Sequence, residues 1–314
     1  MTQSTWSRWQ PLPGDWPPKP SVLAETLDGG QAFRWQRDQE ENWTGVWSDC
    51  VAQLRLSDGR LEWRAPEAIQ QRVARSLPHY LGLDTDWPAC TDALPWRSDA
   101  HLARCLGAFP NLRILRQPFG ETLLGFLCSA TKQIVQIKQM VALLADRHGT
   151  PVLDFGRAGP LGPPSGEAGT AQRSVPTFNQ LPTWAELAAI PEEKLRACLL
   201  GFRARYIHET AQFIAQHPGW LDETERLPYA AAKARLIELP GVGEKVADCV
   251  LLFGAGKLEA FPVDTWILQA LAKRYPLDGW KPAQVAQFGR AHFGPLAGYA
   301  QQYLFSWERK HGRE

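Results

Sequence analysis

The hydrophobic pattern of this chain changes period once, near residue 110, and this change limits the folds that the chain can adopt. Between residues 20 and 66, short aromatic or β-branched segments alternate apolar and polar residues, with turns such as SDG (57–59) between them. Alternation of this kind predicts an antiparallel sheet with one solvated face. Its strands are expected in QAFRWQRD, NWTGVWSD, CVAQLRLSD and RLEWRAP.

Beyond the sheet, apolar residues recur at helical spacing. Two helices are expected at 67–78 and 99–107, and the segment 121–149 predicts helix with a break near 129–131. Residues 154–176 are rich in Gly, Pro and Ser and predict a long exposed loop. The remaining helices are expected at 183–190, 191–200, 203–216, 229–239, 244–254, 264–274, 281–291 and 297–310.

These elements predict an α+β fold with two domains. An N-terminal antiparallel β domain with flanking helices is expected over residues 1–108, and a mostly helical domain over 109–314. The net charge of the whole chain is only +1, but residues 1–110 carry 11 Lys/Arg and 14 Asp/Glu, whereas the remainder carries 23 and 19. The helical part is therefore mildly basic, which is weak evidence for a nucleic-acid partner because phosphate contacts need local charge.

Composition excludes several classes of protein. The 314 residues are 44% hydrophobic and 21% charged, as in soluble globular proteins. No apolar run approaches the roughly 20 residues of a membrane span, and the first 20 residues do not resemble a secretory signal. The six cysteines form no C-x-x-C pair, so we expect reduced thiols and neither a metal nor a cofactor.

The strongest local motif is a pair of helices joined by a four-residue turn. The helical patterns AAAKARLIEL (230–239) and EKVADCVLLFG (244–254) flank the turn PGVG (240–243). Glycines allow positive φ and a close approach to a ligand, and the second helix begins with free N–H groups that attract anions. The turn therefore predicts a site for a nucleic-acid phosphate, and the alternative is a tight turn whose glycines serve packing only.

Lys245 occupies an unusual position in the first turn of the second helix. Its ammonium would face the positive end of the helix dipole, which favours the uncharged amine. An uncharged amine is a nucleophile toward carbonyl-like carbons. The alternative is a lysine that only contacts phosphate.

Asp264 supplies a second candidate catalytic group. It follows Pro262 and precedes a helical pattern, so it is expected to be an N-cap with a fixed carboxylate. Such a carboxylate near a bound sugar could stabilise an oxocarbenium-like transition state. Alternatively, Asp264 is a cap without a chemical role.

With these residues in place, the sequence resembles the helix-hairpin-helix–GPD superfamily of DNA base-excision glycosylases, and within it the 8-oxoguanine DNA glycosylase/AP lyases. The resemblance implies a TBP-like N-terminal sheet domain followed by a helical HhH-GPD core. It rests on six blocks in order: GGQAFRW (29–35), FLCSATKQI (126–134), LLGFRARYI (199–207), LPGVGEKVADC (239–249), PVDTW (262–266) and GYAQQYLFS (298–306).

The resemblance implies roles for catalytic and base-binding residues. Lys245 would attack C1′ of the damaged nucleotide, with β-elimination to follow, and Asp264 would assist the displacement. The carbonyl of Gly30 would accept a hydrogen bond from the N7–H that 8-oxoguanine has and guanine lacks. The other substrate-binding residues would be Cys249 and Phe305, which sandwich the flipped base, Phe253, and Gln301, which binds its Watson–Crick edge.

Further residues would contact the DNA around the lesion. Phe202 corresponds to an aromatic wedge and Arg203 to an arginine that contacts the base opposite the lesion. Thr131 and Gln136 replace an asparagine and an arginine that contact this opposite base in the family, so we expect relaxed opposite-base preference. The remaining DNA-binding positions are Gly241, Val242, Gly243 and Trp266, which replaces a phosphate-binding histidine; Glu308 replaces an aspartate.

Two other functions remain as alternatives. An alkylated-base glycosylase of the same superfamily would need the aspartate and not the lysine, and a non-catalytic DNA-binding module would need neither. The expected partner is double-stranded DNA containing 8-oxoguanine, bound by a monomer without membrane contact. The expected location is the cytoplasm, with the nucleoid, in a bacterium, or the nucleus in a eukaryote.

Overall fold

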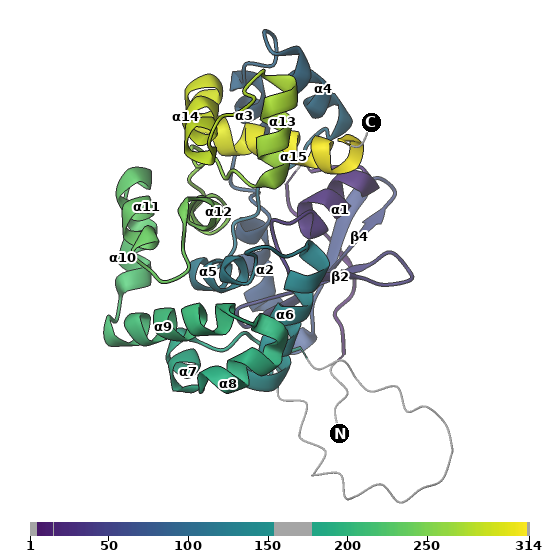
Figure 1. Ribbon diagram of the computed structural model, residues 1–314. Helices are drawn as coiled ribbons and strands as arrows, with labels where there is room; N and C mark the ends of the chain where they lie inside the picture. The colour runs from purple at the N-terminus through teal and green to yellow at the C-terminus, as the bar shows by residue number, and fades with distance from the viewer. Residues whose placement is uncertain (1–4, 15, 154–177, 313–314) are drawn as a thin grey trace, which may run out of the picture.

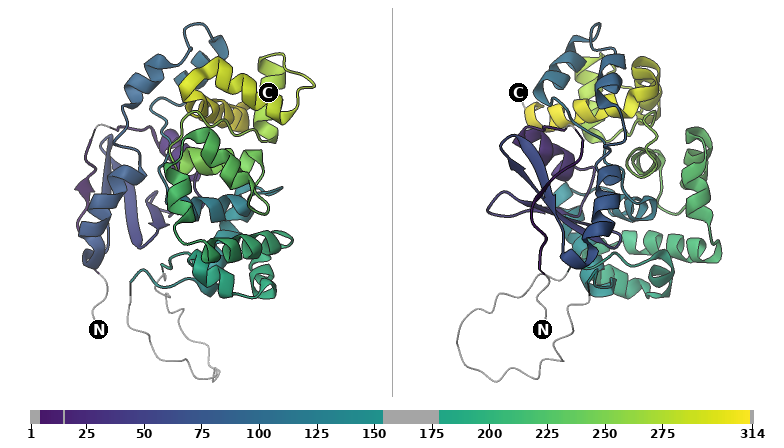
Figure 2. Two further views of the ribbon diagram at one scale, coloured as in Figure 1. Left: turned by 90° about the vertical axis from the view of Figure 1, so that its left-hand side faces the viewer. Right: turned by 180° about the vertical axis from the view of Figure 1, so that it is seen from behind.

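The computed structural model describes residues 5–14, 16–153 and 178–312, so the loop predicted at 154–176 lies outside the described residues. Two layers are visible when the molecule is turned: a twisted sheet on one side and a larger helical body on the other (Figures 1 and 2). The predicted α+β class is confirmed. Among the described residues, no helix is both long and apolar enough to cross a bilayer.

The sheet is antiparallel, with strand order β1-β5-β4-β3-β2. Asp58 and Gly59 join β4 to β5 and both have positive φ (51° and 75°), as the tight hairpin turns that suit sheet twist require. On the buried face, Trp35 stacks on Trp47 with ring centroids 6.2 Å apart. The strands are β1 (Gln10–Pro11), β2 (Trp35–Arg37), β3 (Trp43–Trp47), β4 (Cys50–Ser57) and β5 (Arg60–Arg64).

Of three helices in or beside the first domain, one was expected from the sequence and two were not. Residues 20–28, predicted as part of the β region, form helix α1 (Pro20–Asp28), because Pro20 starts the helix and Val22, Leu23 and Leu27 bury one face. A short helix α3 (Trp87–Ala93), capped by Asp86, was also not predicted. The helix expected at 67–78 is a 3-10 turn followed by α2 (Gln70–Tyr80).

The helical body follows the predicted order, with one further helix, α10 (Trp220–Arg226), that begins after Gly219 at φ 85°. The single helix expected at 191–200 was wrong in its second half, because a π turn at Arg196–Leu200 follows the short first part and Leu199 there has φ 64°. The predicted break near 129–131 separates α5 from α6. The remaining helices are α4 (Ala100–Ala108), α5 (Phe119–Leu127), α6 (Ile134–His148), α7 (Trp184–Ala189), α8 (Glu192–Leu195), α9 (Arg203–Gln216), α11 (Tyr229–Ile237), α12 (Glu244–Phe253), α13 (Thr265–Arg274), α14 (Pro282–Phe293) and α15 (Ala297–His311).

Two hydrophobic cores underlie the two layers. One lies between the sheet, α1 and α2, and the other fills the helical body. Helices α3 and α4 belong to the second core, where Thr91 lies 3.1 Å from the hydroxyl of Tyr299 and Tyr275 donates to Asp99 at 2.8 Å. The division of the chain at residue 108 remains a prediction.

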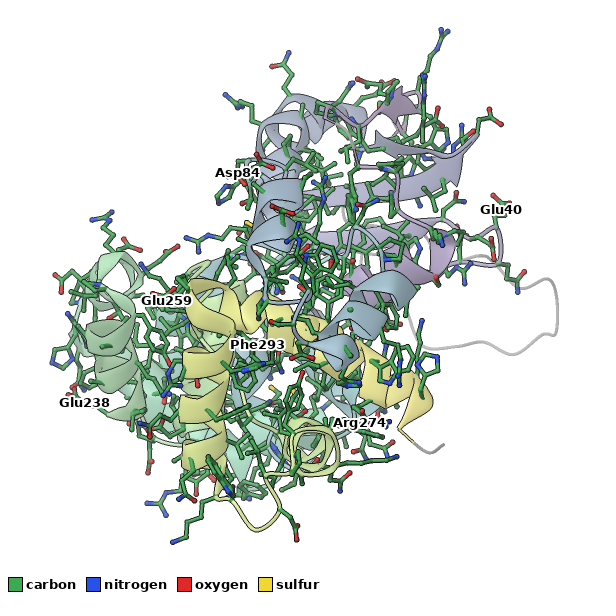
Figure 3. The ribbon with its side chains drawn as sticks, turned by 90° about the horizontal axis from the view of Figure 1, so that it is seen from above. Glu40, Asp84, Glu238, Glu259, Arg274 and Phe293 are labelled. Atoms are coloured by element: carbon green, nitrogen blue, oxygen red, sulfur yellow. The ribbon has the colours of Figure 1, made fainter. Side chains whose placement is uncertain are left out.

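Helices α9, α10 and α11 form one edge of the helical body, and α12 and α5 lie between this edge and the sheet (Figure 1). Seen from above, Glu238 at the end of α11 and Glu40 in the β2–β3 turn lie at opposite ends of the molecule (Figure 3). The edge that carries α11 and the turn to α12 is therefore remote from the solvated face of the sheet.

Candidate active site

The turn between α11 and α12 needs its first glycine for two reasons. Gly241 has φ 77°, and a Cβ atom built on it would lie 2.8 Å from the Cβ of Tyr206 on α9. Gly243 is the N-cap of α12 and provides no side-chain cap, and a Cβ there would meet nothing within 4 Å. The first N–H groups of α12 thus begin at an open surface, which is the geometry of an anion site.

Lys245 lies one turn from Cys249 on α12 and points toward the α5 side. Its Nζ donates to Ser129 Oγ at 3.3 Å and lies 5.2 Å from the centre of the Phe126 ring. Cys249 is buried, and burial raises the pKa of its thiol to about 12 although the nearby Lys245 opposes the shift. The thiol is therefore protonated at neutral pH, so Cys249 does not act as a thiolate nucleophile here.

Asp264 is the N-cap of α13, as predicted, and its Oδ1 accepts a hydrogen bond from the Ile267 N–H at 2.8 Å. Burial raises the pKa of this carboxyl, while the backbone N–H of Ile267 and the charge of Lys245 oppose the shift. Because Lys245 acts on this pKa, the two groups share one electrostatic environment. A carboxylate fixed by its backbone hydrogen bond can stabilise positive charge that develops on a sugar.

Gly30 and Phe305, far apart in the sequence, lie side by side. Gly30 has φ 108°, and a Cβ on it would lie 3.1 Å from Ile134 Cδ1 and 3.7 Å from Phe305 Cε1. Both the backbone conformation and the space therefore favour glycine at this position. Phe253 is buried and stacks on Phe126 with ring centroids 5.6 Å apart, so it supports the ring that faces Lys245.

Gln301 is buried, and both ends of its amide have protein partners. Its Nε2 donates to the Pro262 carbonyl at 3.1 Å, and its Oε1 accepts from Gln302 Nε2 at 3.0 Å. The first bond ties α15 to the segment that carries Asp264. The second N–H of Nε2 and the second lone pair of Oε1 carry no hydrogen bond from the described part of the chain, so Gln301 can bind a base edge while keeping both contacts.

Gln31 fixes the segment beside Gly30 and was not singled out from the sequence. This buried side chain donates from Nε2 to the Arg113 carbonyl at 2.8 Å and accepts at Oε1 from the Leu115 N–H at 2.9 Å. Its own carbonyl accepts from Gln117 Nε2 at 2.7 Å. Its place within the block GGQAFRW (29–35) is the sequence signal that could have pointed to this residue, because its burial and its partners are visible only in the structure.

The predicted wedge lies at the exposed edge. The side chain of Phe202 is 52% exposed and makes an edge-on contact with Tyr206, with ring centroids 6.0 Å apart. Tyr206 in turn packs against Gly241, so wedge and hairpin turn are connected through one aromatic ring. Leu199, next to the wedge, is 53% exposed with φ 64°, and sequence patterns alone did not identify it.

Arg203 and Thr131 are in contact, but the arginine is not free. Its guanidinium is buried and hydrogen-bonds the Ala130 carbonyl, the Leu200 carbonyl at 3.2 Å and Thr131 Oγ1 at 3.0 Å. Burial also lowers the pKa of this guanidinium from its ordinary value. Gln136 is exposed in the first turn of α6, where its Oε1 accepts from the Gln133 N–H at 3.2 Å.

Two further replacements lie on the α13 side. Trp266 is half-buried in the first turn of α13 and lines a surface cleft that also includes Glu308. Glu308 itself is buried and pairs with Arg274 at 3.1 Å. This glutamate therefore has a structural partner within the protein.

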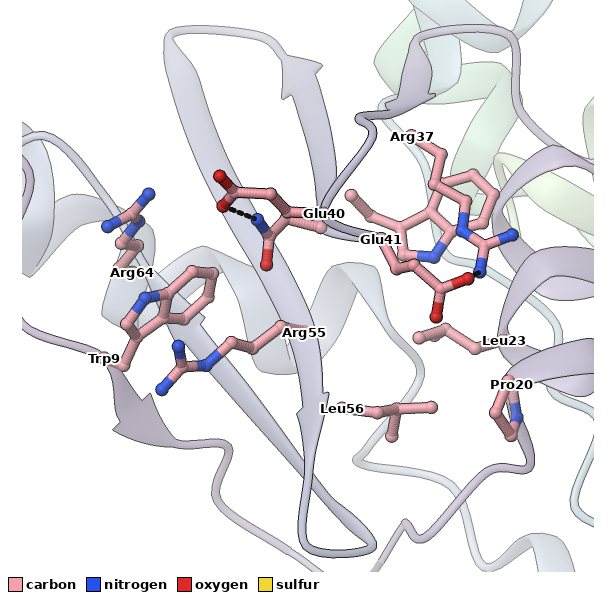
Figure 4. Close-up of a pocket in the computed structure, with 11 residues that line it drawn as sticks. Trp9, Pro20, Leu23, Arg37, Glu40, Glu41, Arg55, Leu56 and Arg64 are labelled. Atoms are coloured by element: carbon pink, nitrogen blue, oxygen red, sulfur yellow. Dashed lines mark hydrogen bonds and ion pairs between the residues drawn. The ribbon is translucent and has the colours of Figure 1, made fainter.

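A separate pocket lies at the sheet, is lined by residues of both its faces, and contains none of the predicted site residues (Figure 4). The guanidinium groups of Arg55 and Arg64 lie 4.3 and 4.4 Å from the ring centre of Trp9. Arg55 also pairs with Glu62 at 2.7 Å across the strands. These contacts form a cross-strand ladder typical of a solvated sheet face.

The chain matches two protein families. Residues 17–123 match the family described as 8-oxoguanine DNA glycosylase, N-terminal domain, and residues 167–292 match the HhH-GPD superfamily base excision DNA repair proteins. A solved structure of an 8-oxoguanine glycosylase/lyase of Clostridium acetobutylicum, in complex with double-stranded DNA containing cytosine opposite 8-oxoguanine, has a TM-score of 0.80 at 27% identity. The similarity covers 92% of each chain.

Two curated relatives are similar in sequence. An N-glycosylase/DNA lyase of Arabidopsis thaliana is 27% identical over 303 residues, which are 90% of this chain and 76% of the relative. A probable N-glycosylase/DNA lyase of Methanothermobacter thermautotrophicus is 41% identical over 118 residues. That match spans only 38% of each of the two chains.

Proposed function

We propose that this chain removes 8-oxoguanine from duplex DNA and then cleaves the abasic site. The chain belongs to the HhH-GPD superfamily of base excision DNA repair proteins and contains the N-terminal domain of 8-oxoguanine DNA glycosylases. The observation that carries the proposal is the position of Lys245. It lies at the open start of α12, in the electrostatic environment of Asp264 and one turn from a protonated Cys249.

The proposed reaction starts from a phosphate bound at the turn 241–243, which brings the sugar of a flipped nucleotide toward Lys245. The Lys245 amine nitrogen forms a bond to C1′ while the bond from C1′ to the base nitrogen breaks and the base leaves with the electron pair. Asp264 stabilises the positive charge that develops on the sugar. The nitrogen loses one proton to the departed base and one to the ring oxygen as the sugar ring opens, which gives an imine. In the β-elimination that follows, C2′ loses a proton while the C3′–O bond breaks, and the 3′ phosphate leaves with the electron pair.

The lesion would be distinguished by a hydrogen bond that its N7–H donates to the carbonyl of Gly30. The position is supported by the absence of a side chain at residue 30 and by the adjacent ring of Phe305. Cys249 and Phe305 would contact the two faces of the flipped base, with Phe253 supporting them and Gln301 at the Watson–Crick edge. The protonated Cys249 thiol suits such an apolar contact.

The DNA on the opposite strand would meet Phe202, Arg203, Thr131 and Gln136. Thr131 and Gln136 offer no positive charge to the opposite base, and Arg203 is engaged by carbonyl groups of the protein. We therefore infer that preference for the opposite base is relaxed. The protein is expected to act as a monomer on DNA, in the bacterial cytoplasm or the eukaryotic nucleus.

Borohydride trapping on an 8-oxoguanine duplex tests this function. A covalent protein–DNA adduct that is absent in Lys245→Gln supports the lysine mechanism. Excision without an adduct would instead favour an alkylated-base type of mechanism, and no excision would favour a DNA-binding module.

A further inference from the structure

We propose that Lys233 is a positioning residue that holds the carboxylate of Glu244 away from the DNA phosphate at the start of α12. This inference rests on the proposed function, because it takes the turn 241–243 to be a phosphate site. Lys233 lies on α11, and Glu244 is the residue directly before the catalytic lysine.

Glu244 is an unexpected neighbour for a phosphate. It is the first residue of α12, and its side chain is 65% exposed. A carboxylate at this position interacts favourably with the helix dipole and therefore competes with an incoming phosphate for the same N–H groups. It also adds a like charge close to that phosphate.

Lys233 binds this carboxylate from the side. Its Nζ lies 2.5 Å from Glu244 Oε2 and 3.0 Å from Asp248 Oδ2, while its side chain is only 10% exposed. Glu244 and Asp248 are one helical turn apart, so one ammonium group bridges both carboxylates on the same face of α12. Glu244 is thus held toward α11.

Asp248 keeps Lys233 in place. This carboxylate is buried and also accepts a hydrogen bond from the Tyr229 hydroxyl at 2.7 Å, and Tyr229 in turn is 3.4 Å from Arg290. One cation, Lys233, therefore contacts both carboxylates, and Arg290 reaches the cluster only through Tyr229. Lys233 is too deeply placed to bind the phosphate itself, so its effect on DNA is exerted through Glu244.

The charge count makes an unusual prediction about double variants. Lys233→Met makes the net charge of the cluster beside the phosphate site more negative by one, and Glu244→Gln makes it more positive by one, with Lys233 still paired to Asp248. Lys233→Met/Glu244→Gln restores the original balance. A residue with a purely structural role would not be rescued by a second substitution that removes another of its contacts.

The experiment measures binding to a duplex with a stable tetrahydrofuran abasic-site analogue at several salt concentrations. Lys233→Met is expected to weaken binding about fivefold to tenfold at low salt, and Glu244→Gln to strengthen it about twofold to fivefold. The double variant is expected within about twofold of the wild type, and all differences shrink as salt rises. The matched control is Glu41→Gln, another exposed carboxylate paired with a basic side chain, which lies on the remote sheet and should change nothing.

Equal weakening in Lys233→Met and in the double variant would overturn the proposal, as would weaker binding by Glu244→Gln. If Lys233→Met does not fold, as judged by circular dichroism, Glu244→Gln decides alone, because its exposed side chain is not needed for packing. Failure of the proposed function would look different: the wild-type protein would then neither bind the analogue duplex nor form a trapped adduct with 8-oxoguanine DNA.

Discussion

Gly241→Ala is expected to damage both the hairpin turn and DNA binding. Residue 241 has φ 77°, a conformation that costs an alanine about 1–2 kcal/mol. In addition, the new Cβ would lie 2.8 Å from the Cβ of Tyr206, and a Cβ cannot move unless the backbone moves. The turn or α9 must therefore shift, which displaces the N–H groups that we expect to bind phosphate.

Two glycines separate strain from the clash. Gly59 has a similar φ of 75° but a Cβ there would meet nothing within 4 Å, so Gly59→Ala should show the strain alone. Gly243 has a φ of −95°, open to any residue, and equal space around it, so Gly243→Ala should keep the wild-type unfolding temperature. Gly241→Ala should be destabilised more than Gly59→Ala, with a fall in unfolding temperature of roughly 2–4 °C for each kcal/mol lost.

The assay combines thermal unfolding with binding to the abasic-analogue duplex. Loss of one hydrogen bond to a charged phosphate costs roughly 1.5–3 kcal/mol, which corresponds to about tenfold to hundredfold weaker binding by Gly241→Ala. Gly59→Ala should lose stability without any loss of DNA affinity. Unchanged DNA affinity in a folded Gly241→Ala variant would refute the assignment of the turn as the phosphate site.

Three more predictions concern the catalytic groups and the opposite base. Burial raises the pKa of Asp264 above 3.8, and the ionised form is the active one, so single-turnover excision should fall as pH decreases through this raised pKa. Asp264→Asn should lower the excision rate at least about hundredfold and abolish this fall at acid pH. An unchanged fall at acid pH in the variant would contradict the role of Asp264. Because the pKa of Cys249 is about 12, a thiol-alkylating reagent at pH 8 should leave this cysteine unmodified in the native protein, which mass spectrometry can check. Rapid alkylation would show that the thiol is not buried as described. Excision opposite the four normal bases should differ by less than about tenfold, since Thr131 and Gln136 carry no charge and Arg203 is engaged by the protein; a loss of two orders of magnitude for every base except cytosine would disprove this.

Local signals made the hairpin and the Asp264 cap predictable. Both depend on residues adjacent in sequence: glycines before an amphipathic helix in one case, and Asp264 ahead of a helical pattern in the other. The break between α5 and α6 could be predicted for the same reason. Helix α1 could not, because the alternation of the following strands was extended back over residues that in fact bury one helical face.

Long-range contacts explain what the sequence pattern missed. Gln31 acts through the backbone of residues 113 and 115, which no local period connects to it. The contact of Arg203 with Ala130 depends on how α9 packs beside the α5–α6 break. The Lys233–Glu244 pair joins two helices whose relative rotation is fixed by tertiary packing, and not by the turn sequence alone.

The most direct test of the account is borohydride trapping by the wild-type protein and by Lys245→Gln, on a duplex that contains a single 8-oxoguanine. Lys257→Gln, which replaces another half-buried lysine, is the matched control. We expect the wild type and Lys257→Gln to give a covalent adduct that peptide mapping assigns to Lys245, and Lys245→Gln to give none. An adduct of undiminished yield in Lys245→Gln, or excision by the wild type without any adduct, would contradict the central role of this lysine.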